Sequence, residues 1–334
     1  MPASPKSPSL RARIVSTGSY APEKVLTNRD LEKMVETSDE WITERTGIKQ
    51  RRIASAGESA SDLGYEAARQ ALKNAGLKPR DIDLIITATM SGDMIFPATA
   101  CLIQKKLGAK NAAAFDVSAA CSGFIFGLSV ADGYIRSSSF RRVLVVGAEV
   151  MSRFVDWRDR STCVLFGDGA GAAVLAPTEE DRGIVSVSIH SDGTLAELLA
   201  LPGGGSRHPA SCDTVEKGLH YIKMRGNDTF KVAVKTLEKL VVDTLKKNKL
   251  KPSDIALLIP HQANLRIIAA TARRLDLPLD RVVVNIDRYG NTSAASIPIA
   301  LDEAVRTLRV REGDYILMEA FGGGLTWASA LVRW

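Results

Sequence analysis

A cysteine between an apolar run and a helical pattern is the first candidate for chemistry in this sequence. The run Asn111–Val117 contains no Gly or Pro and is typical of a buried strand, and beyond the turn at Ser118–Gly123 apolar residues recur at helical spacing. Cys121 is therefore predicted at the start of a helix, where free N–H groups and the helix dipole favour thiolate over thiol. A small apolar cysteine in a packed core would fit the same position, so both interpretations stay open here.

Two further polar residues stand where apolar strands end. His261 directly follows the strand pattern that ends at Pro260, and Asn291 lies in a turn before a helical pattern that tolerates Pro298 in its first turn. Taken singly, each of these residues is often a helix cap or a satisfied core group. A thiol, an imidazole and a carboxamide at three strand-to-helix turns together suggest nucleophilic catalysis assisted by hydrogen-bond donors.

The elements that would position these turns occur twice along the chain. Leu77–Ile82 is echoed by Leu250–Ile255, and each copy follows an amphipathic helical pattern and precedes an apolar strand. Two further pairs match in the same order, namely Val143–Val146 with Tyr315–Met318 and Cys121 with Asn291. We therefore expect an α/β fold of two duplicated βαβ-rich halves, with largely parallel strands, helices on both sheet faces and a pseudo-twofold axis. Sites in such sheets form at the carboxyl ends of the strands.

The domain boundaries follow from this repeat. We expect a loose leader at residues 1–10, an N-terminal half at 11–180 that carries the cysteine, and a C-terminal half at 181–334 that carries the histidine and the asparagine. The leader is rich in Pro and Ser without an apolar segment behind it, which is atypical of a signal peptide or a membrane anchor.

Composition excludes several function classes. No run approaches the roughly 18 apolar residues of a membrane span, and no basic run interleaved with aromatics suggests nucleic acid binding. The 4 cysteines are widely spaced and form no Cys-x-x-Cys pair, so we expect no metal site and a reducing, cytoplasmic setting. The net charge of +6 fits either a solvated surface or attraction to an acidic partner or a phosphate-bearing ligand.

A glycine-rich stretch at Phe166–Ala173 invites comparison with a dinucleotide-binding loop. It lacks the G-x-G-x-x-G spacing, and no ribose-binding acid follows it. We interpret these glycines as a site of close strand packing in the sheet core.

Three segments resemble the signatures of the β-ketoacyl-acyl carrier protein synthase III family. Members of this family are condensing enzymes with a thiolase-like fold. These segments are Ala119–Phe124, Pro260–Asn264 and Gly290–Ala295, and further likeness lies in Asp39–Ile48, Phe166–Gly171 and Glu319–Gly324. The resemblance extends from about Ile14 to Trp334. It implies a thiolase-like fold with αβαβα layers and an acyltransferase that begins type II fatty acid synthesis.

The resemblance also implies a role for each of the three turns. Cys121 would attack an acyl thioester, and the backbone N–H groups of Cys121 and Gly323 would form an oxyanion hole. His261 and Asn291 would each donate a hydrogen bond to the thioester oxygen of a malonyl group as it loses CO2. A coenzyme A (CoA) thioester would be a substrate, and no cofactor is expected. Asn291 also argues against a thiolase, in which the resemblance would predict a second His.

Binding residues follow from the same resemblance. Trp41 would stack on the adenine of CoA, and Asn264 would support His261. The full set of expected CoA contacts is Trp41, Arg45, Thr46, Arg160, Asn227 and Asn264. Arg266 and Gln262 would contact acidic carrier protein, while Phe96 and Phe321 would line the acyl pocket, Phe96 by reaching across a homodimer. The expected partners are acetyl-CoA or another short acyl-CoA and malonyl-acyl carrier protein.

Two other functions remain compatible with the sequence. One is a related condensing enzyme, or a thioesterase acting through Cys121, that serves secondary metabolism with other acyl groups. The other is a module that binds acyl groups or CoA without catalysis, which predicts that Cys121→Ala leaves function intact.

Overall fold

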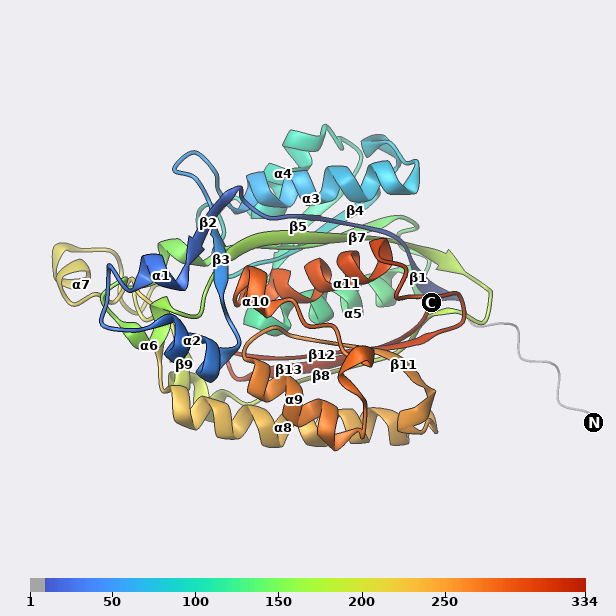
Figure 1. Cartoon of the computed structure of the whole chain (residues 1–334). Coiled ribbons are helices and arrows are strands. Elements are labelled where there is room, and N and C mark those ends of the chain that lie inside the picture. The colour runs from blue at the N-terminus through green and yellow to red at the C-terminus, as the bar shows by residue number, and fades with distance from the viewer. Residues whose placement is uncertain (1–9) are drawn as a thin grey trace, which may run out of the picture.

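Two sheets alternate with three layers of helices in this chain (Figure 1). The computed structural model describes residues 10–334, so residues 1–9 of the expected leader lie outside the described residues. The order from top to bottom in the figure is an outer pair α3 (Ala60–Ala75) and α4 (Thr99–Leu107), a central pair α5 (Gly123–Arg136) and α11 (Ser296–Arg306), and a second outer pair α8 (Gly226–Asn248) and α9 (Leu265–Arg274). The predicted αβαβα arrangement is confirmed.

The first sheet has five strands in the described residues. Its order is β1 (Arg11–Tyr20), β7 (Asp168–Thr178), β6 (Val143–Val150), β4 (Leu84–Ala88) and β5 (Ala113–Val117). Strands β6, β4 and β5 run parallel, whereas β7 is antiparallel to both of its neighbours. The carboxyl ends of β4, β5 and β6 therefore meet at one edge of the sheet, next to the turn that holds Cys121.

The second sheet repeats this scheme with four strands. Its order is β11 (Ile255–Pro260), β12 (Tyr315–Gly322), β13 (Thr326–Arg333) and β8 (Gly183–Ser191). Only residues 323–325 separate β12 from β13, and such a short link makes the two strands antiparallel. In place of a counterpart to β5, Val282 forms a single parallel bridge to Leu258.

The helices begin and end at the residues that local chemistry favours. Ser59 and Asp62 form a capping box at the start of α3, and Gly76 ends that helix with φ 66°. Thr27 and Asp30 form a second capping box, at the start of the short helix α1 (Asn28–Leu31). The repeated Pro-containing segments form matching 3₁₀ turns, Pro79–Asp81 and Pro252–Asp254, and in each the backbone N–H of the preceding lysine donates to the aspartate side chain.

The remaining elements lie near the carboxyl ends of the parallel strands or connect the main layers. They are β2 (Lys24–Thr27), β3 (Gln50–Ile53), α2 (Asp39–Thr46), α6 (Arg160–Cys163), β9 (Leu199–Ala200), α7 (Cys212–Glu216), β10 (Lys223–Met224) and α10 (Ile286–Tyr289). Strand β2 pairs with β3 and β9 pairs with β10. No helix within residues 10–334 has the length and apolarity needed to span a membrane.

The glycine-rich stretch before and within β7 is packed against other backbone. A Cβ atom on Gly167 would lie 2.3 Å from the Tyr289 carbonyl oxygen, and one on Gly171 would lie 2.6 Å from the Pro298 carbonyl carbon. Only glycine lets these backbones approach so closely, so the interpretation as close strand packing is confirmed.

The two duplicated turns correspond in a different register from the predicted one. Ala120, at φ 45°, and Ser293, at φ 48°, each begin or enter a 3₁₀ turn that leads directly into a central helix. Matching these two residues places Cys121 opposite Ala294, not opposite Asn291. Asn291 lies two residues before the left-handed Ser293, whereas Cys121 directly follows the left-handed Ala120.

Candidate active site

A cavity of about 340 Å³ opens where the carboxyl ends of the two sheets meet. Cys121, His261 and Asn291 all line it, so the structure brings the three predicted turns together. Eight other predicted residues also line this cavity or its mouth, namely Trp41, Arg45, Thr46, Arg160, Asn227, Asn264, Arg266 and Phe321. The predicted Gly323 does not line it, but the preceding residue, Gly322, does.

Cys121 lies in the 3₁₀ turn Ala120–Ser122, immediately before α5. Its side chain is buried, and the pKa of its thiol is raised to about 12, chiefly by this burial. A hydrogen bond with Ser293 lowers the pKa in part, and the charge of Glu149 contributes to raising it. The expectation of a resting thiolate at the helix start is wrong, because loss of hydration outweighs the favourable position. Cys121 is therefore a neutral thiol before a ligand binds.

The last residue of β12, Gly322, packs against the cysteine backbone. A Cβ atom on Gly322 would lie 2.6 Å from the Cys121 backbone nitrogen and 3.0 Å from its Cβ. Gly323, the predicted oxyanion donor, lines a small second cavity of about 20 Å³ together with Cys121. Both glycines thus lie near Cys121, and neither leaves room for a side chain, because a Cβ atom on Gly323 would lie 2.9 Å from the Leu199 carbonyl oxygen.

His261 extends from the end of β11 into the cavity. Its backbone N–H donates to the Glu319 carbonyl of β12 at 2.8 Å, and its Nδ1 lies 2.8 Å from the Ser296 hydroxyl. Nε2 has no hydrogen-bond partner within residues 10–334. Burial lowers the pKa of the imidazole to about 3, so the ring is neutral at physiological pH.

Hydrogen bonds of both its backbone and its side chain hold Asn291 in place. Its N–H donates to the Leu165 carbonyl at 2.8 Å, and its carbonyl accepts from Gly167 N–H at 3.1 Å. The side-chain Oδ1 accepts the Ser293 N–H at 2.9 Å. Since the oxygen is engaged in the turn, the NH2 group is the part of the amide that is left to face a ligand.

The mouth of the cavity carries aromatic and cationic groups. The guanidinium of Arg160 lies 4.8 Å from the Trp41 ring centroid, and that of Arg45 lies 5.6 Å from it. Arg266 lies over the Phe230 ring at 5.0 Å. Such a set suits a ligand with a flat ring and phosphate groups.

Comparisons with known proteins agree with this geometry. The family model of the C-terminal domain of 3-oxoacyl-[acyl-carrier-protein] synthase III matches residues 245–334, and the model named for the same enzyme matches residues 115–193. A curated beta-ketoacyl-[acyl-carrier-protein] synthase III of Caldanaerobacter subterraneus is 56% identical over 97% of this chain and 98% of its own length. The chain belongs to this synthase III family.

Two other relatives extend the comparison. The beta-ketoacyl-[acyl-carrier-protein] synthase III of Thioalkalivibrio sulfidiphilus is 58% identical over 96% of this chain and 99% of its own length. The crystal structure of the 3-oxoacyl-[acyl-carrier-protein] synthase III from Aquifex aeolicus is 51% identical, with a TM-score of 0.89 over 97% of this chain and 100% of that one. Members of the synthase III family are condensing acyltransferases of fatty acid synthesis, and the thiolase-like fold of this chain is theirs.

Gln262 does not occupy the place expected of a carrier-protein contact in the synthase III family. It is 1% exposed, and its NH2 group donates to the carbonyls of Pro260 and Val283 at 2.9 and 3.0 Å. Its Oε1 accepts the backbone N–H groups of Asn285 and Ile286 at 2.9 and 3.1 Å. With every polar atom engaged, Gln262 ties the loop after His261 to the segment before Asn291, and the prediction of a surface contact is wrong.

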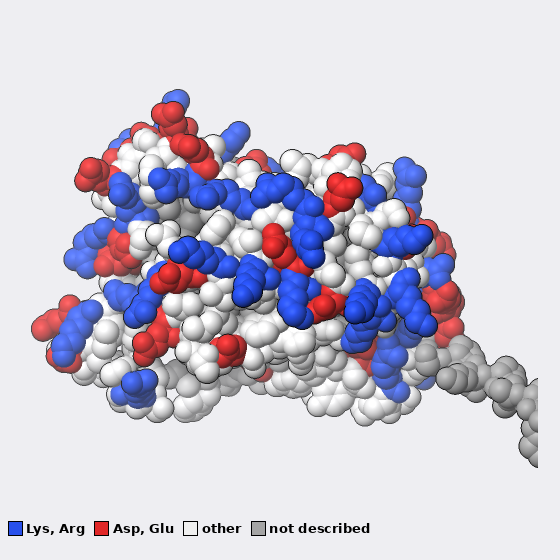
Figure 2. Space-filling view, turned by 90° about the horizontal axis from the view of Figure 1, so that it is seen from below, with Lys and Arg blue, Asp and Glu red and all other residues white. Residues whose placement is uncertain are grey.

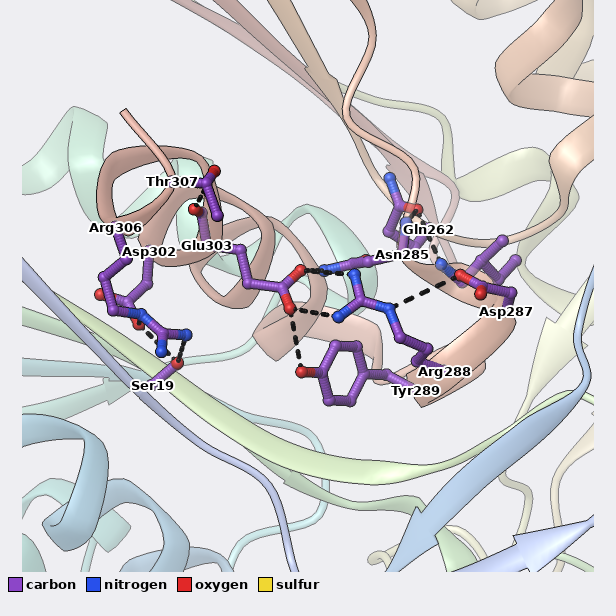
Figure 3. A network of polar contacts seen from close by, with 11 residues as sticks. Ser19, Gln262, Asn285, Asp287, Arg288, Tyr289, Asp302, Glu303, Arg306 and Thr307 are labelled. Atoms are coloured by element: carbon purple, nitrogen blue, oxygen red, sulfur yellow. Dashed lines mark hydrogen bonds and ion pairs between the residues drawn. The ribbon is translucent and has the colours of Figure 1, made fainter. Parts of the chain in front are cut away.

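The segment that Gln262 anchors is also tied to the central layer. Glu303 of α11 accepts hydrogen bonds from Asn285, Arg288 and Tyr289 at 2.7–3.0 Å (Figure 3). Helix α10, which carries two of these donors, leads directly into Asn291. These contacts position the second catalytic turn.

Asn264 and Thr46 line the cavity but engage their side chains elsewhere. Asn264 caps α9 through the Arg266 N–H at 2.9 Å and donates to the Arg45 carbonyl at 3.0 Å, so it does not support His261 as expected. The Thr46 hydroxyl donates to the Ile42 carbonyl at 2.6 Å and accepts the Ile48 N–H at 3.0 Å. Both residues therefore fix the ends of helices at the mouth of the cavity: Thr46 at the end of α2 and Asn264 at the start of α9.

The two predicted acyl-pocket phenylalanines lie in different environments. Phe321 is buried and lines the main cavity at the end of β12. Phe96 is 82% exposed in the loop before α4 and does not line the cavity of its own chain. Its expected role requires a second copy of the chain.

Sequence reasoning missed two groups of polar residues around the trio. Ser296 is the hydroxyl partner of His261, and Glu149 at the end of β6 accepts from Ser293 at 2.9 Å and from Ser91. Burial raises the pKa of Glu149. The available signal was a single acid that ends an otherwise apolar strand pattern, and a serine spaced five residues after Asn291.

Proposed function

We propose that this chain condenses a short acyl-CoA primer, acetyl-CoA above all, with malonyl-acyl carrier protein to begin type II fatty acid synthesis. The products would be 3-oxoacyl-acyl carrier protein, CoA and CO2. One observation carries the proposal, namely that Cys121, His261 Nε2 and the Asn291 amide share one cavity whose mouth is aromatic and cationic.

In the first half-reaction the Cys121 sulfur attacks the primer carbonyl and the bond to the CoA sulfur breaks. The thiol proton leaves with CoA as its thiol, so the protein gains only the acyl group. The backbone N–H groups of Cys121 and Gly323 would donate to the tetrahedral oxyanion, and both residues line the small cavity beside the thiol, which supports this role. One such donor is typically worth about 2.7–4 kcal/mol in the transition state.

In the second half-reaction the malonyl thioester loses CO2, and the electron pair of that bond forms an enolate. His261 Nε2–H and the Asn291 NH2 group would donate to the enolate oxygen, which needs neutral donors and no base. The enolate carbon then attacks the acyl-Cys121 carbonyl. Cys121 leaves as a thiolate and recovers a proton from solvent. Every step uses side chains and backbone of this chain, and we propose that no cofactor takes part.

The size of the space behind the thiol supports a short primer. The second cavity, of about 20 Å³, lies next to Cys121 and is lined by apolar side chains, among them Met90, Met151, Leu199 and Ile222. A space of about 10–15 Å³ already holds one water molecule, so this cavity accepts a group close to the size of a methyl. Acetyl would fit, whereas longer primers would require these side chains to move.

The mouth of the main cavity supports a CoA-bearing substrate. The guanidinium groups of Arg45 and Arg160 lie 5.6 and 4.8 Å from the Trp41 ring centroid, so an adenine that binds at the indole would also meet two cations. Asn227, the second residue of α8, lines the same cavity as the thiol and would contact the pantetheine arm.

The face that carries α8 and α9 supports docking of an acidic carrier protein. Figure 2 shows this face from below, with Lys and Arg side chains spread across it and fewer Asp and Glu. The cations on the two helices include Lys231, Lys235, Arg266, Arg273 and Arg274. Arg266 also lines the cavity mouth, so a carrier held on this face would present its thioester to the thiol.

A homodimer is part of the proposal. Met94, Ile95 and Phe96 are 52%, 85% and 82% exposed in one loop, and a contiguous apolar patch of this kind favours burial against a partner. We propose a cytoplasmic location, which suits the free thiols of Cys101, Cys121, Cys163 and Cys212.

A second candidate function has support of its own. A crystal structure described as the priming beta-ketosynthase from the R1128 polyketide biosynthetic pathway is 37% identical to this chain, with a TM-score of 0.90 over 99% of the chain. By this likeness, the chain would prime a secondary metabolite with another acyl group. The small cavity behind Cys121 favours acetyl over such a primer.

Incubation of the protein with a series of acyl-CoA primers and malonyl-carrier protein tests the proposal. We expect 3-oxoacyl product with acetyl-CoA, an acyl adduct on Cys121 by mass spectrometry, and loss of both in Cys121→Ala. Cys163→Ala is the matched control, because Cys163 is also buried but does not line the cavity. Absence of product with every short primer, or an adduct on another residue, would contradict the proposal.

A further inference from the structure

Ser296 is placed to decide which ring nitrogen of His261 carries the proton. It is the first residue of α11 and is 2% exposed. Its Oγ lies 2.8 Å from His261 Nδ1 and 2.8 Å from the Gln262 backbone nitrogen. No other hydrogen-bond partner of this hydroxyl lies within residues 10–334.

The proton inventory of this contact has one fully satisfied solution. The Gln262 N–H can only donate, so it uses a lone pair of the Ser296 oxygen and cannot receive the hydroxyl proton. The remaining neighbour of that proton is His261 Nδ1, which accepts it only when the ring proton is on Nε2. With the proton on Nδ1 instead, two N–H donors would point at one oxygen and the buried hydroxyl proton would have no acceptor.

We propose that Ser296 is a positioning residue that holds neutral His261 as the Nε2–H tautomer and so keeps its free donor aimed into the cavity. The catalytic consequence rests on the proposed function, in which that N–H donates to the enolate oxygen. The tautomer itself follows from the contacts around Nδ1 and holds whatever the substrate is.

The surroundings of the ring leave the choice to Ser296. The His261 backbone N–H donates to Glu319 of β12, its carbonyl accepts from the Ala263 N–H, and the burial of the ring keeps it neutral across physiological pH. No carboxylate or carbonyl oxygen bonds Nδ1 in the described part of the chain, as would be required to favour the opposite tautomer. Removing the Ser296 hydroxyl would therefore leave Nδ1 without a donor and let the two tautomers mix.

Nitrogen NMR of the full-length protein tests this without any substrate. The chain has 4 histidines, so ¹⁵N-histidine labelling gives few signals, and His261→Gln identifies those of His261. We expect a protonated Nε2 and an unprotonated, hydrogen-bonded Nδ1 in the wild type, and a shift of both signals toward the average of the two tautomers in Ser296→Ala. A wild-type His261 protonated at Nδ1 would overturn the proposal, as would identical tautomer signals in Ser296→Ala.

A kinetic split tests the consequence. Ser296→Ala is expected to slow malonyl decarboxylation by about tenfold, less than the 10²–10³ that loss of a whole donor costs, while Cys121 acylation changes little. Ser296→Thr, which keeps the hydroxyl, should restore both the wild-type signals and the decarboxylation rate. Equal slowing of both half-reactions, or no rescue by a folded Ser296→Thr, would overturn it.

The two measurements separate this inference from the proposed function. A wild type that shows the Nε2–H tautomer but neither binds nor decarboxylates malonyl thioester would refute the function and leave the tautomer assignment standing. A wild type that decarboxylates normally with the proton on Nδ1 would refute the role of Ser296 and leave the function standing.

Discussion

Glu319 makes the stability of this protein depend on pH in an unusual direction. It lies in β12 beside the catalytic turn, is 1% exposed, and its Oε2 has no hydrogen-bond partner among the residues the structure describes. Burial raises the pKa of this carboxyl from 4.5 to about 8, with only a contact from Thr271 opposing the shift. The folded protein therefore holds a neutral carboxylic acid at neutral pH.

The direction of the pH dependence follows from the number of protons bound in the folded and unfolded states. An unfolded chain loses this proton above pH 4.5, whereas the folded chain keeps it until about pH 8, so folding becomes less favourable as pH rises through this window. Each pH unit corresponds to about 1.4 kcal/mol, and the window spans roughly 3.5 units. The full effect is on the order of 4–5 kcal/mol lost between pH 4.5 and 8, relative to a chain that has no such group.

Glu319→Gln removes the titration while keeping the shape of the side chain. We expect urea unfolding of the wild type to show a free energy that falls from pH 5 to pH 8 relative to Glu319→Gln, by about 4 kcal/mol. Glu303→Gln is the matched control, because hydrogen bonds from Arg288 and Asn285 outweigh burial and lower the pKa of Glu303. That variant should lose stability above pH 4.5, where the wild-type carboxylate is ionised.

A parallel pH dependence of the wild type and Glu319→Gln would refute the assignment of a neutral buried acid. So would a Glu319→Gln protein that is less stable than the wild type at pH 8, since an ionised and well-bonded carboxylate would then be the favoured state. Both tests use one protein concentration, because the proposed dimer would make the midpoint depend on it.

Three further predictions concern the site. Gly322→Ala should slow Cys121 acylation at least tenfold, because the added Cβ would lie 2.6 Å from the Cys121 nitrogen. Gly205→Ala is the control, since its Cβ would meet nothing within 4 Å in the described chain. If mass spectrometry showed an unchanged rate of adduct formation in Gly322→Ala, this prediction would be contradicted. Burial lowers the pKa of His261 to about 3, so the malonyl decarboxylation rate should show no inflection near pH 6.5, and a histidine-like inflection there would refute the neutral-donor role. Trp41→Ala should raise KM for acetyl-CoA by about 5–30-fold with little change in kcat and leave an acetyl-pantetheine substrate unaffected; equal effects on both substrates would exclude adenine stacking.

The sequence predicts the fold well because the signals that define it are local and repeated. Capping residues such as Ser59 and Gly76 mark helix ends directly, and the two Pro-containing turns recur in both halves. The meeting of the three candidate residues was predictable in part for a similar reason. Cys121 and His261 each follow a parallel strand, and the carboxyl ends of such strands converge by topology alone. Asn291 follows the short helix α10, so the expectation that it follows a strand is wrong.

The contacts around the trio could not be predicted, because they depend on which side chains meet across the layers. Gln262 reads as a polar loop residue, yet four backbone groups use its amide and bury it. Ser296 reads as a helix-start residue, yet it bonds a ring 35 residues away. The protonation state of Cys121 shows the same limit. Its position at a helix start could be predicted from the sequence, but the burial that raises the pKa of its thiol could not.

The register of the duplicated turns shows how one type of backbone turn could serve the two roles proposed for Cys121 and Asn291. Both turns hold a left-handed residue, Ala120 or Ser293, that directs the chain into a central helix. In the first copy the reactive side chain is the next residue, at the helix start, where backbone N–H groups surround it. In the second copy Ala294 occupies that place, and the functional amide of Asn291 lies before the turn, fixed through its oxygen by the Ser293 N–H. A nucleophile needs nearby N–H donors and an enolate donor needs a fixed NH2 group, so the same backbone turn supplies both when the functional residue sits on opposite sides of its left-handed position.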